Sequence, residues 1–171
     1  MIKPLIPIAF LLSLTPMAVA QEAPRLIGTF ERWTAYSYAE KGVPACYAAA
    51  KPATSRGAPD KRGEIFLLVT HRPNQKTFDV VSFVAGYAFK KGEAAELTIG
   101  KDKFKLFTEA ERAWAPDDKT DRAIAQAMVK AGEMVLRGTP AKGQAVIDTF
   151  SLKGFTRAYD AISKACKVKR S

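Results

Sequence analysis

The sequence predicts a mainly β fold, a β-sandwich with a short internal helix and a C-terminal helix. About eight or nine short runs of apolar, aromatic and β-branched residues follow one another along the chain, with turn-forming residues between them. Only two stretches have the apolar spacing of an amphipathic helix. A parallel α/β sheet needs a helix between successive strands, so this pattern favours a sandwich.

The N-terminal residues have the pattern of a secretory signal peptide. Lys3 gives a positive start, Leu5 to Leu14 an apolar stretch, and Ala18 to Ala20 a small-residue cleavage site. We therefore expect residues 1–20 to be removed and residues 21–171 to form one domain, in the periplasm, secreted or at the outer surface. The apolar stretch is shorter than the roughly 20 residues of a membrane-spanning helix, so no transmembrane segment is expected after cleavage.

The first half of the mature sequence contains strand-like segments separated by loops. Pro52 to Gly63 holds two prolines, two glycines and four charged residues, which is typical of a surface loop. Gly86 offers a place for a bulge or kink within the longest segment. The predicted strands are Leu26–Ala35, Cys46–Ala50, Glu64–Thr70 and Thr77–Phe89.

The second half combines a hairpin with the two helices and two more strands. The hairpin turns at Gly100 to Asp102, after Leu97 and Ile99, and its alternation places Phe104 and Leu106 inward. Lys103 and Lys105 then point to water. The remaining predicted elements are a helix over Thr120–Ala131, strands over Met134–Arg137 and Ala145–Leu152, and a terminal helix over Phe155–Cys166.

Cys46 and Cys166 are the only cysteines of the chain. An exported protein meets an oxidising environment, so we expect them to form one disulfide that closes a loop of about 120 residues. The alternative is a redox or metal pair. However, the C-x-x-C spacing is absent, and the single histidine, His71, cannot complete a zinc site.

Catalytic motifs are absent from the sequence: there is no nucleophile elbow, P-loop, dinucleotide-binding loop or zinc-protease motif. His71 is expected in a turn beside Arg72 and Pro73, with a solvated or turn-bonded imidazole, and a catalytic base is the alternative. Asp79 and Asp148 lie inside apolar strand patterns, and Asp148 is predicted to point inward, where a carboxylate needs a partner. A structural ion pair is the first interpretation of these acids, and a perturbed catalytic acid is the alternative. We expect no enzyme activity, cofactor or metal.

Basic residues dominate the charge: 27 Lys and Arg stand against 17 Asp and Glu, a formal net charge of +10. Such a surface favours acidic partners, and export makes nucleic acid a poor candidate. Solvated surface charge is the alternative. The candidate polyanion-binding residues are Lys101, Lys103, Lys105, Lys164, Lys167, Lys169 and Arg170, with a further basic group at Lys51, Arg56, Lys61 and Arg62. The residues interpreted as core aromatics rather than as ligand platforms are Trp33, Tyr47, Phe66, Phe78, Phe104 and Trp114.

An ordered set of short motifs covers nearly all of the mature chain. The motifs are Gly28, Phe30 and Trp33; Cys46–Tyr47; Arg62–Gly63; Val69–Thr70 with Arg72–Pro73; Gly86–Lys90; Ile99–Gly100; Phe104–Thr108; Ala113–Trp114; Ala127–Met128; Met134–Val135; Asp148–Leu152; Gly154–Thr156; and Cys166. In this order the set resembles the invasion-associated locus B family.

The resemblance implies an immunoglobulin-like β-sandwich in a secreted or periplasmic protein of Gram-negative bacteria, linked in pathogenic members to host-cell invasion. It implies a family disulfide at Cys46 and Cys166 and transfers no catalytic residues. We therefore expect a non-catalytic binding protein whose basic surface meets an anionic envelope or host-surface component, or a partner protein. The alternatives are a periplasmic hydrolase that uses Asp148 or Asp79, and a periplasmic chaperone or assembly factor with an exposed strand edge.

Overall fold

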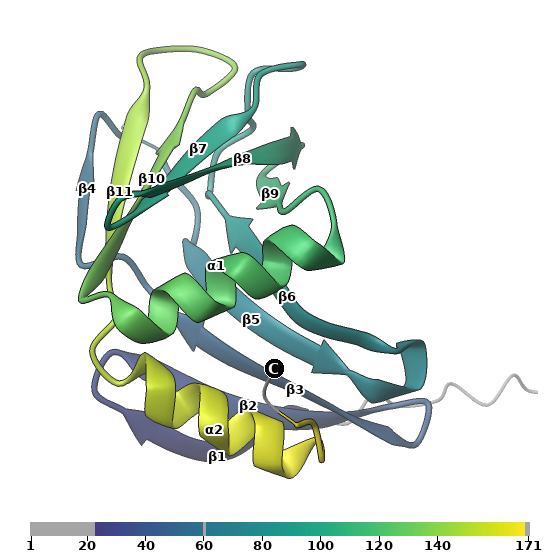
Figure 1. Cartoon of the computed structure of the whole chain (residues 1–171). Coiled ribbons are helices and arrows are strands. Elements are labelled where there is room, and N and C mark those ends of the chain that lie inside the picture. The colour runs from purple at the N-terminus through teal and green to yellow at the C-terminus, as the bar shows by residue number, and fades with distance from the viewer. Residues whose placement is uncertain (1–22, 60, 170–171) are drawn as a thin grey trace, which may run out of the picture.

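The computed structural model describes residues 23–59 and 61–169, and the predicted signal peptide lies outside these residues. Eleven strands of the described chain pair antiparallel in the order β1-β2-β3-β5-β6-β9-β8-β7-β10-β11-β4 (Figure 1). The strands are β1 (Arg25–Phe30), β2 (Trp33–Glu40), β3 (Val43–Ala50), β4 (Thr54–Arg56), β5 (Phe66–Arg72), β6 (Thr77–Val84), β7 (Ala95–Ile99), β8 (Asp102–Glu109), β9 (Arg112–Trp114), β10 (Glu133–Gly138) and β11 (Val146–Ser151).

Strand β8 joins the two halves of the sandwich. Residues 102–106 of β8 pair with β7 in sheet B, and residues 107–109 pair with β9 in sheet A. Sheet A contains β1, β2, β3, β5, β6 and β9, and sheet B contains β7, β10, β11 and β4. The inner faces meet where Phe83 of β6 packs edge-on against Phe150 of β11, with ring centroids 5.8 Å apart. The predicted mainly β sandwich is confirmed.

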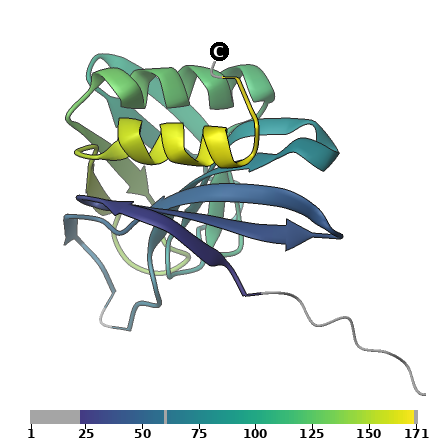
Figure 2. The same cartoon turned by 90° about the horizontal axis from the view of Figure 1, so that it is seen from below.

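Two helices cover one face of sheet A, as the view from below shows (Figure 2). Helix α1 (Asp118–Lys130) packs on β6, and helix α2 (Phe155–Ala165) packs on β1, β2 and β3. Asp117 begins α1, because its side chain accepts a hydrogen bond from the Thr120 amide at 2.7 Å. This bond lowers the pKa of the Asp117 carboxyl. Both predicted helices are therefore confirmed, with α1 starting two residues earlier than expected.

The predicted disulfide is confirmed. Cys46 on β3 and Cys166 at the end of α2 are bonded, with their Cα atoms 6.0 Å apart. The bridge fastens the last helix to the middle of sheet A. The other end of α2 is fixed by packing, since the Phe155 ring lies 4.8 Å from the ring of the buried Trp33. Both ends of α2 are therefore attached to the same sheet.

Several predicted strand assignments differ from the structure. Strand β3 begins earlier than predicted, β5 extends to Arg72, and β9 was not predicted. The segment 26–35 is a hairpin of β1 and β2, with Glu31 in a left-handed conformation at its turn. Strand β6 ends at Val84 rather than Phe89, because Gly86 has a φ of +69° and lies against Gly63, where a Cβ atom would come within 2.5 Å of the Gly63 carbonyl oxygen. The short strand β4 lies inside the predicted loop.

Candidate functional site

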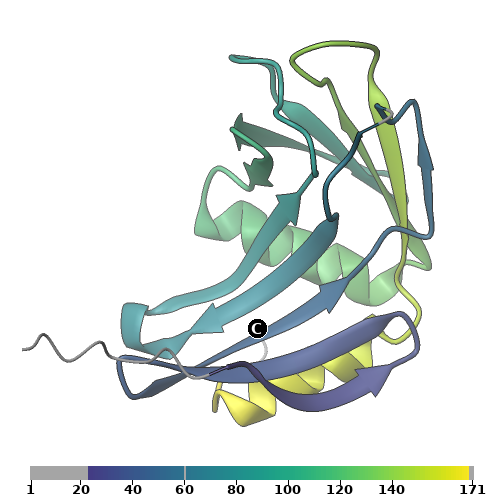
Figure 3. The same ribbon diagram turned by 180° about the vertical axis from the view of Figure 1, so that it is seen from behind.

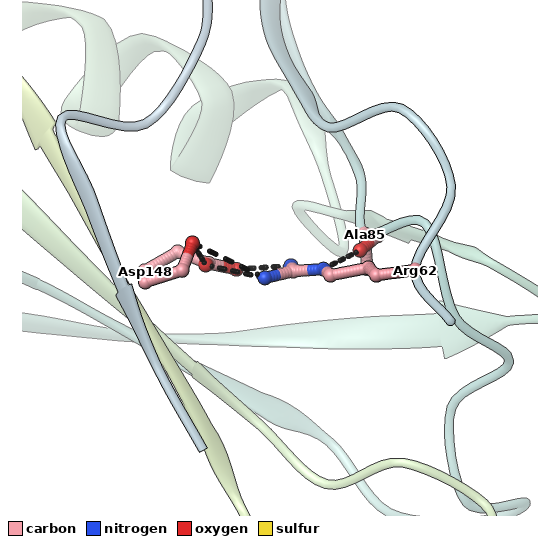
Figure 4. Close-up of polar contacts among 4 residues, drawn as sticks. Arg62, Ala85 and Asp148 are labelled. Carbon is pink, nitrogen blue, oxygen red and sulfur yellow. Dashed lines mark hydrogen bonds and ion pairs between the residues drawn. The ribbon is translucent and has the colours of Figure 1, made fainter. Parts of the chain in front are cut away.

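Asp148 lies at the centre of β11 and forms a buried ion pair with Arg62 (Figure 4). The Arg62 guanidinium donates to the two Asp148 oxygens at 2.8 and 2.6 Å, and its Nε donates to the Ala85 carbonyl at 2.7 Å. Ser55 on β4 donates a third hydrogen bond to Asp148 at 2.6 Å. The Asp148 and Arg62 side chains are only 1% and 8% exposed. The prediction that Asp148 points inward and needs a partner is confirmed.

The surroundings of this ion pair show that it is structural. Tyr87 packs under Arg62, with the guanidinium carbon 5.0 Å from the ring centroid. Burial, followed by the nearby Asp148 charge, raises the pKa of Tyr87 to about 12. Arg62 was expected to be a basic residue of a surface loop, and that expectation is wrong because its charge is used inside the fold. Both Asp148 oxygens are occupied, so it is not a free catalytic acid.

Asp79, the second candidate acid, belongs to a buried polar cluster between β5, β6 and α2. The Tyr159 hydroxyl donates to an Asp79 carboxylate oxygen. The Asp79 amide donates to Nδ1 of His71 at 3.1 Å, and Nε2 of His71 lies 3.1 Å from the Ser163 hydroxyl. His71 is fully buried on β5, so the prediction of a solvated turn histidine is wrong. The turn begins one residue after the strand, at Pro73.

The cluster contains serine, histidine and aspartate, yet its hydrogen bonds run opposite to those of a catalytic triad. Nδ1 of His71 accepts from the Asp79 amide, so the proton of the neutral ring is on Nε2 and is donated to Ser163. In a triad the serine hydroxyl donates to the histidine. Burial lowers the pKa of His71, and the Asp79 charge opposes this shift. All three side chains are buried, so the cluster connects α2 to sheet A.

The basic residues of β8 belong to a row that crosses the outer face of sheet B. Directly opposed residues of antiparallel strands point to the same face. The register places Lys105 of β8 opposite Glu96 of β7, Glu96 opposite Arg137 of β10, Arg137 opposite Ile147 of β11, and Ile147 opposite Arg56 of β4. Cations therefore occur at every second strand, about 10 Å apart at the usual strand spacing.

Most charges of this face are unpaired. Lys103 lies 3.6 Å from Glu96. Within the described residues, Lys105, Arg137 and Arg56 form no ion pair. All four cations are exposed, which agrees with the prediction that Lys103 and Lys105 point to water. We call Lys103, Lys105, Arg137 and Arg56 the sheet B basic face.

The lysines after α2 form a separate group. Figure 1 shows α2 at the opposite end of the molecule from β8, with α1 between them. Lys167 and Lys169 line a pocket of about 290 Å³ together with Arg122 of α1. Lys164 is exposed on the last turn of α2, and Arg170 lies outside the described residues. Helix α1 therefore lies between the two lysine groups, and Lys103 of the first group lines a pocket with Ala123 and Lys130 of α1.

Figure 3 shows that no helix covers the outer face of sheet A. This face has an aromatic groove, lined by Tyr36, Tyr47 and Phe66, that the sequence did not predict. Its volume is about 620 Å³. Tyr47, expected in the core, stacks on Tyr36 with ring centroids 5.1 Å apart and meets Tyr38 edge-on at 6.0 Å. Phe66 and Leu68 continue the groove on β5. Burial and the two neighbouring tyrosines raise the pKa of Tyr47.

The lining of this groove also contains charged residues. Lys51 pairs with Glu64 at 2.6 Å, and Glu31 pairs with Arg157 at 2.7 Å. Arg32 also lines the groove and, within the described residues, forms no ion pair. The groove therefore combines aromatic side chains with a single unpaired cation, whereas three cations of the sheet B basic face are unpaired.

The described part of the chain contains neither a metal-binding cluster nor a helix suited to cross a membrane. No three His, Cys, Asp or Glu side chains come together there in a way that could hold a metal ion. None of the helices in that part combines the length and the apolar character needed to cross a bilayer.

These features define a mainly β sandwich with a two-helix cover, a disulfide between sheet and helix, and buried acids with structural partners. The family model described as invasion associated locus B (IalB) protein matches residues 33–163. The chain therefore belongs to the invasion-associated locus B family, as the resemblance of its motifs predicted.

A solved structure of another protein has a similar fold. The chain superposes on the crystal structure of invasion associated protein b from Bartonella henselae with a TM-score of 0.60. The match has 14% sequence identity and covers 85% of this chain and 98% of that chain. At this identity the similarity concerns the fold. No curated protein matches the sequence.

Proposed function

We propose that the protein is exported and works without catalysis, by binding an anionic component of the cell envelope through the sheet B basic face. The observation that carries the proposal is the row that crosses five strands with a cation on every second strand, in which Glu96 is the single acidic residue. A polyanion laid across the strands would meet a positive side chain about every 10 Å. A role in host-cell invasion would follow if the same face met a polyanion on a host surface.

The catalytic alternative lacks a free acid. Asp148 is bound by Arg62 and Ser55, and Asp79 is bound by Tyr159. The buried histidine has the proton on the nitrogen that a general base would need free. These arrangements support a binding role over a hydrolase.

The chaperone alternative requires a long unpaired strand edge. In the described chain β1 and β4 end the order of paired strands. Strand β4 has three residues, and the pairing of β1 shifts register between Leu26 and Gly28. Residues 77–81 of β6 and 102–106 of β8 also pair on one side only, and α1 packs on both of these strands. Short, irregular or helix-covered edges discourage the addition of a further strand, so these edges favour a binding role over the chaperone alternative.

The test is a titration of the mature protein against lipopolysaccharide micelles at low and high salt. We expect the apparent affinity to fall at least tenfold between 50 and 300 mM NaCl, because added salt screens the attraction between the exposed cations and the polyanion. A triple variant, Lys103→Gln, Lys105→Gln and Arg137→Gln, should lose at least tenfold in affinity at low salt.

A matched control removes the same charge from cations that already have partners. The variant Lys51→Gln, Arg72→Gln and Arg157→Gln breaks three surface ion pairs outside the sheet B basic face. It should lose less than threefold in affinity. Binding that ignores salt, or equal losses in the two triple variants, would refute the proposal.

A further inference from the structure

A small pocket lies where the chain leaves α2, beside the disulfide. The β5–β6 hairpin contributes Pro73 and Phe78, helix α1 contributes Arg122, and the segment after α2 contributes Lys167 and Lys169. The volume is about 290 Å³. Since pockets for drug-sized ligands begin at about 300 Å³, this one suits a small ion or a single headgroup.

Three cations converge on this pocket without acidic partners. Within the described residues, Arg122, Lys167 and Lys169 form no ion pair. The one acid of the lining, Asp79, is nearly buried, and its carboxylate accepts a hydrogen bond from Tyr159. The pocket therefore has an excess of positive charge at its mouth. The ring of Phe78, 37% exposed, adds an apolar wall.

The backbone at Lys167 is held by hydrogen bonds where the chain leaves α2. Lys167 has a left-handed conformation, with a φ of +54°. The amides of Lys167 and Val168 donate to the carbonyls of Lys164 and Ser163, at 3.2 and 2.8 Å. Glycine is the favoured residue in this conformation, because a side chain there is strained. The side chain of Lys167 lines the pocket.

The backbone that leads to Lys167 is also fixed to sheet A. Cys166, the residue before Lys167, is bonded to Cys46 on β3. Ser163, one turn earlier, is hydrogen-bonded to the buried His71. A ligand would therefore meet charges whose backbone is already fixed, which reduces the entropy that binding loses.

We propose that this pocket binds a phosphate group, with Arg122, Lys167 and Lys169 as its ligands and Phe78 against the group that carries the phosphate. Guanidinium and ammonium groups are the usual partners of phosphate oxygens. The site lies apart from the sheet B basic face and does not depend on the function proposed for that face.

The experiment titrates the mature protein with inorganic phosphate by NMR, following the backbone amides of residues 166–169 and of α1 around Arg122. We expect saturable shifts at these amides. Lys167→Gly removes the charge and relieves the strained backbone, so it should lower the phosphate affinity at least tenfold while raising the melting temperature by about 2 to 4 °C.

Lys41→Gly is the matched control. Lys41 is also a lysine in a left-handed turn, with a φ of +53°, and it does not line the pocket. Its substitution should leave the phosphate affinity unchanged. Wild-type protein without saturable shifts, or equal affinity in wild type and Lys167→Gly, would overturn the proposal.

Two further measurements complete the experiment. The first distinguishes a lipid phosphate from a soluble one, and the second distinguishes this pocket from the sheet B basic face. Vesicles that contain phosphatidic acid should bind in a Lys167-dependent way if the phosphate belongs to a lipid headgroup, whereas binding of inorganic phosphate alone identifies a soluble ligand. The variant Lys103→Gln, Lys105→Gln and Arg137→Gln should keep its phosphate affinity. Loss of phosphate binding in that variant would refute a separate site.

Discussion

Arg62 and Asp148, 86 residues apart in the sequence, form a two-armed ion pair inside the sandwich, with N–O distances of 2.8 and 2.6 Å. The pair fastens the segment after β4 to the middle of β11. The same arginine holds the Ala85 carbonyl at the end of β6. One side chain therefore ties together a loop, sheet A and sheet B.

Removing one member of this pair should destabilise the protein strongly. Arg62→Met leaves the Asp148 carboxylate buried without its cation, which costs about 3 to 5 kcal/mol. The double variant Arg62→Met and Asp148→Leu should recover much of this loss, because no charge remains buried. Urea unfolding measures both. A single variant within 1 kcal/mol of wild type would show that the pair is unimportant.

Gly154 is a position where only glycine fits. It precedes α2 with a φ of +88°, and a Cβ atom would lie 1.9 Å from the Phe30 carbonyl oxygen. We expect Gly154→Ala to lower the free energy of unfolding by about 3 kcal/mol or more, from backbone strain and displacement of the helix. Gly92→Ala is the control: its φ is +80°, but no atom lies within 4 Å of the added Cβ. It should cost about 1 kcal/mol.

The disulfide should stabilise the protein mainly by lowering the conformational entropy of the unfolded chain. Its loop spans 120 residues, for which the chain-entropy model gives about 4 to 5 kcal/mol at most. The variant Cys46→Ala and Cys166→Ala should unfold at a lower urea concentration. Adding a reductant should shift wild type to the same midpoint and leave the variant unchanged. Equal midpoints for oxidised and reduced wild type would contradict this account.

Asp121 should make the protein less stable at high pH. Burial, only partly offset by the hydrogen bond from the Val81 amide, raises the pKa of Asp121 from 3.8 to about 7. Between these values the folded chain holds a proton that the unfolded chain releases, so this group's contribution to stability is present at low pH and is lost as pH rises through 7.

Asp121→Asn should therefore raise the free energy of unfolding at pH 8 by about 1 to 2 kcal/mol, below the bound of about 4 kcal/mol that the full shift would give. The gain should vanish towards pH 4, where the folded wild type is neutral at this position. Urea unfolding at both values checks the prediction, and a gain that does not depend on pH would refute it.

His71 should change the stability with pH in the opposite direction from Asp121, and make the protein less stable at low pH. Burial lowers its pKa below 6.5 in the folded state, so the unfolded chain binds a proton that the folded chain does not. The contribution of His71 is complete above pH 6.5 and decreases as pH falls. The Asp121→Asn variant removes the opposing effect, and its stability should therefore decrease from pH 7 to pH 5. A flat profile in this variant would contradict the burial of a neutral His71.

Local patterns in the sequence predicted much of the fold. The alternation around Lys103 and Lys105 gave the β7–β8 hairpin with the correct faces, and the spacing of apolar residues gave both helices. Asp148 was correctly placed inward by its parity with its strand neighbours. These features depend on residues close together in the chain, where periodicity is informative.

The features that the sequence analysis missed or predicted wrongly depend on contacts between segments far apart in the chain. His71 stands next to Arg72 and Pro73, which signal a turn, and its burial under Ser163 depends on α2, 92 residues away. The composition around Arg62 indicates a surface loop, while the side chain reaches Asp148. The pocket of Arg122 and Lys167 joins α1 to the segment after α2, and no local pattern places those residues together.

Cys166 follows all the strands and both helices, whereas Cys46 lies on the third strand. The Cys46 thiol therefore has no native partner until every described strand and both helices have been made. A chain that stops before Cys166 would keep a free thiol on β3, so formation of the bridge distinguishes a chain with α2 from a shortened one.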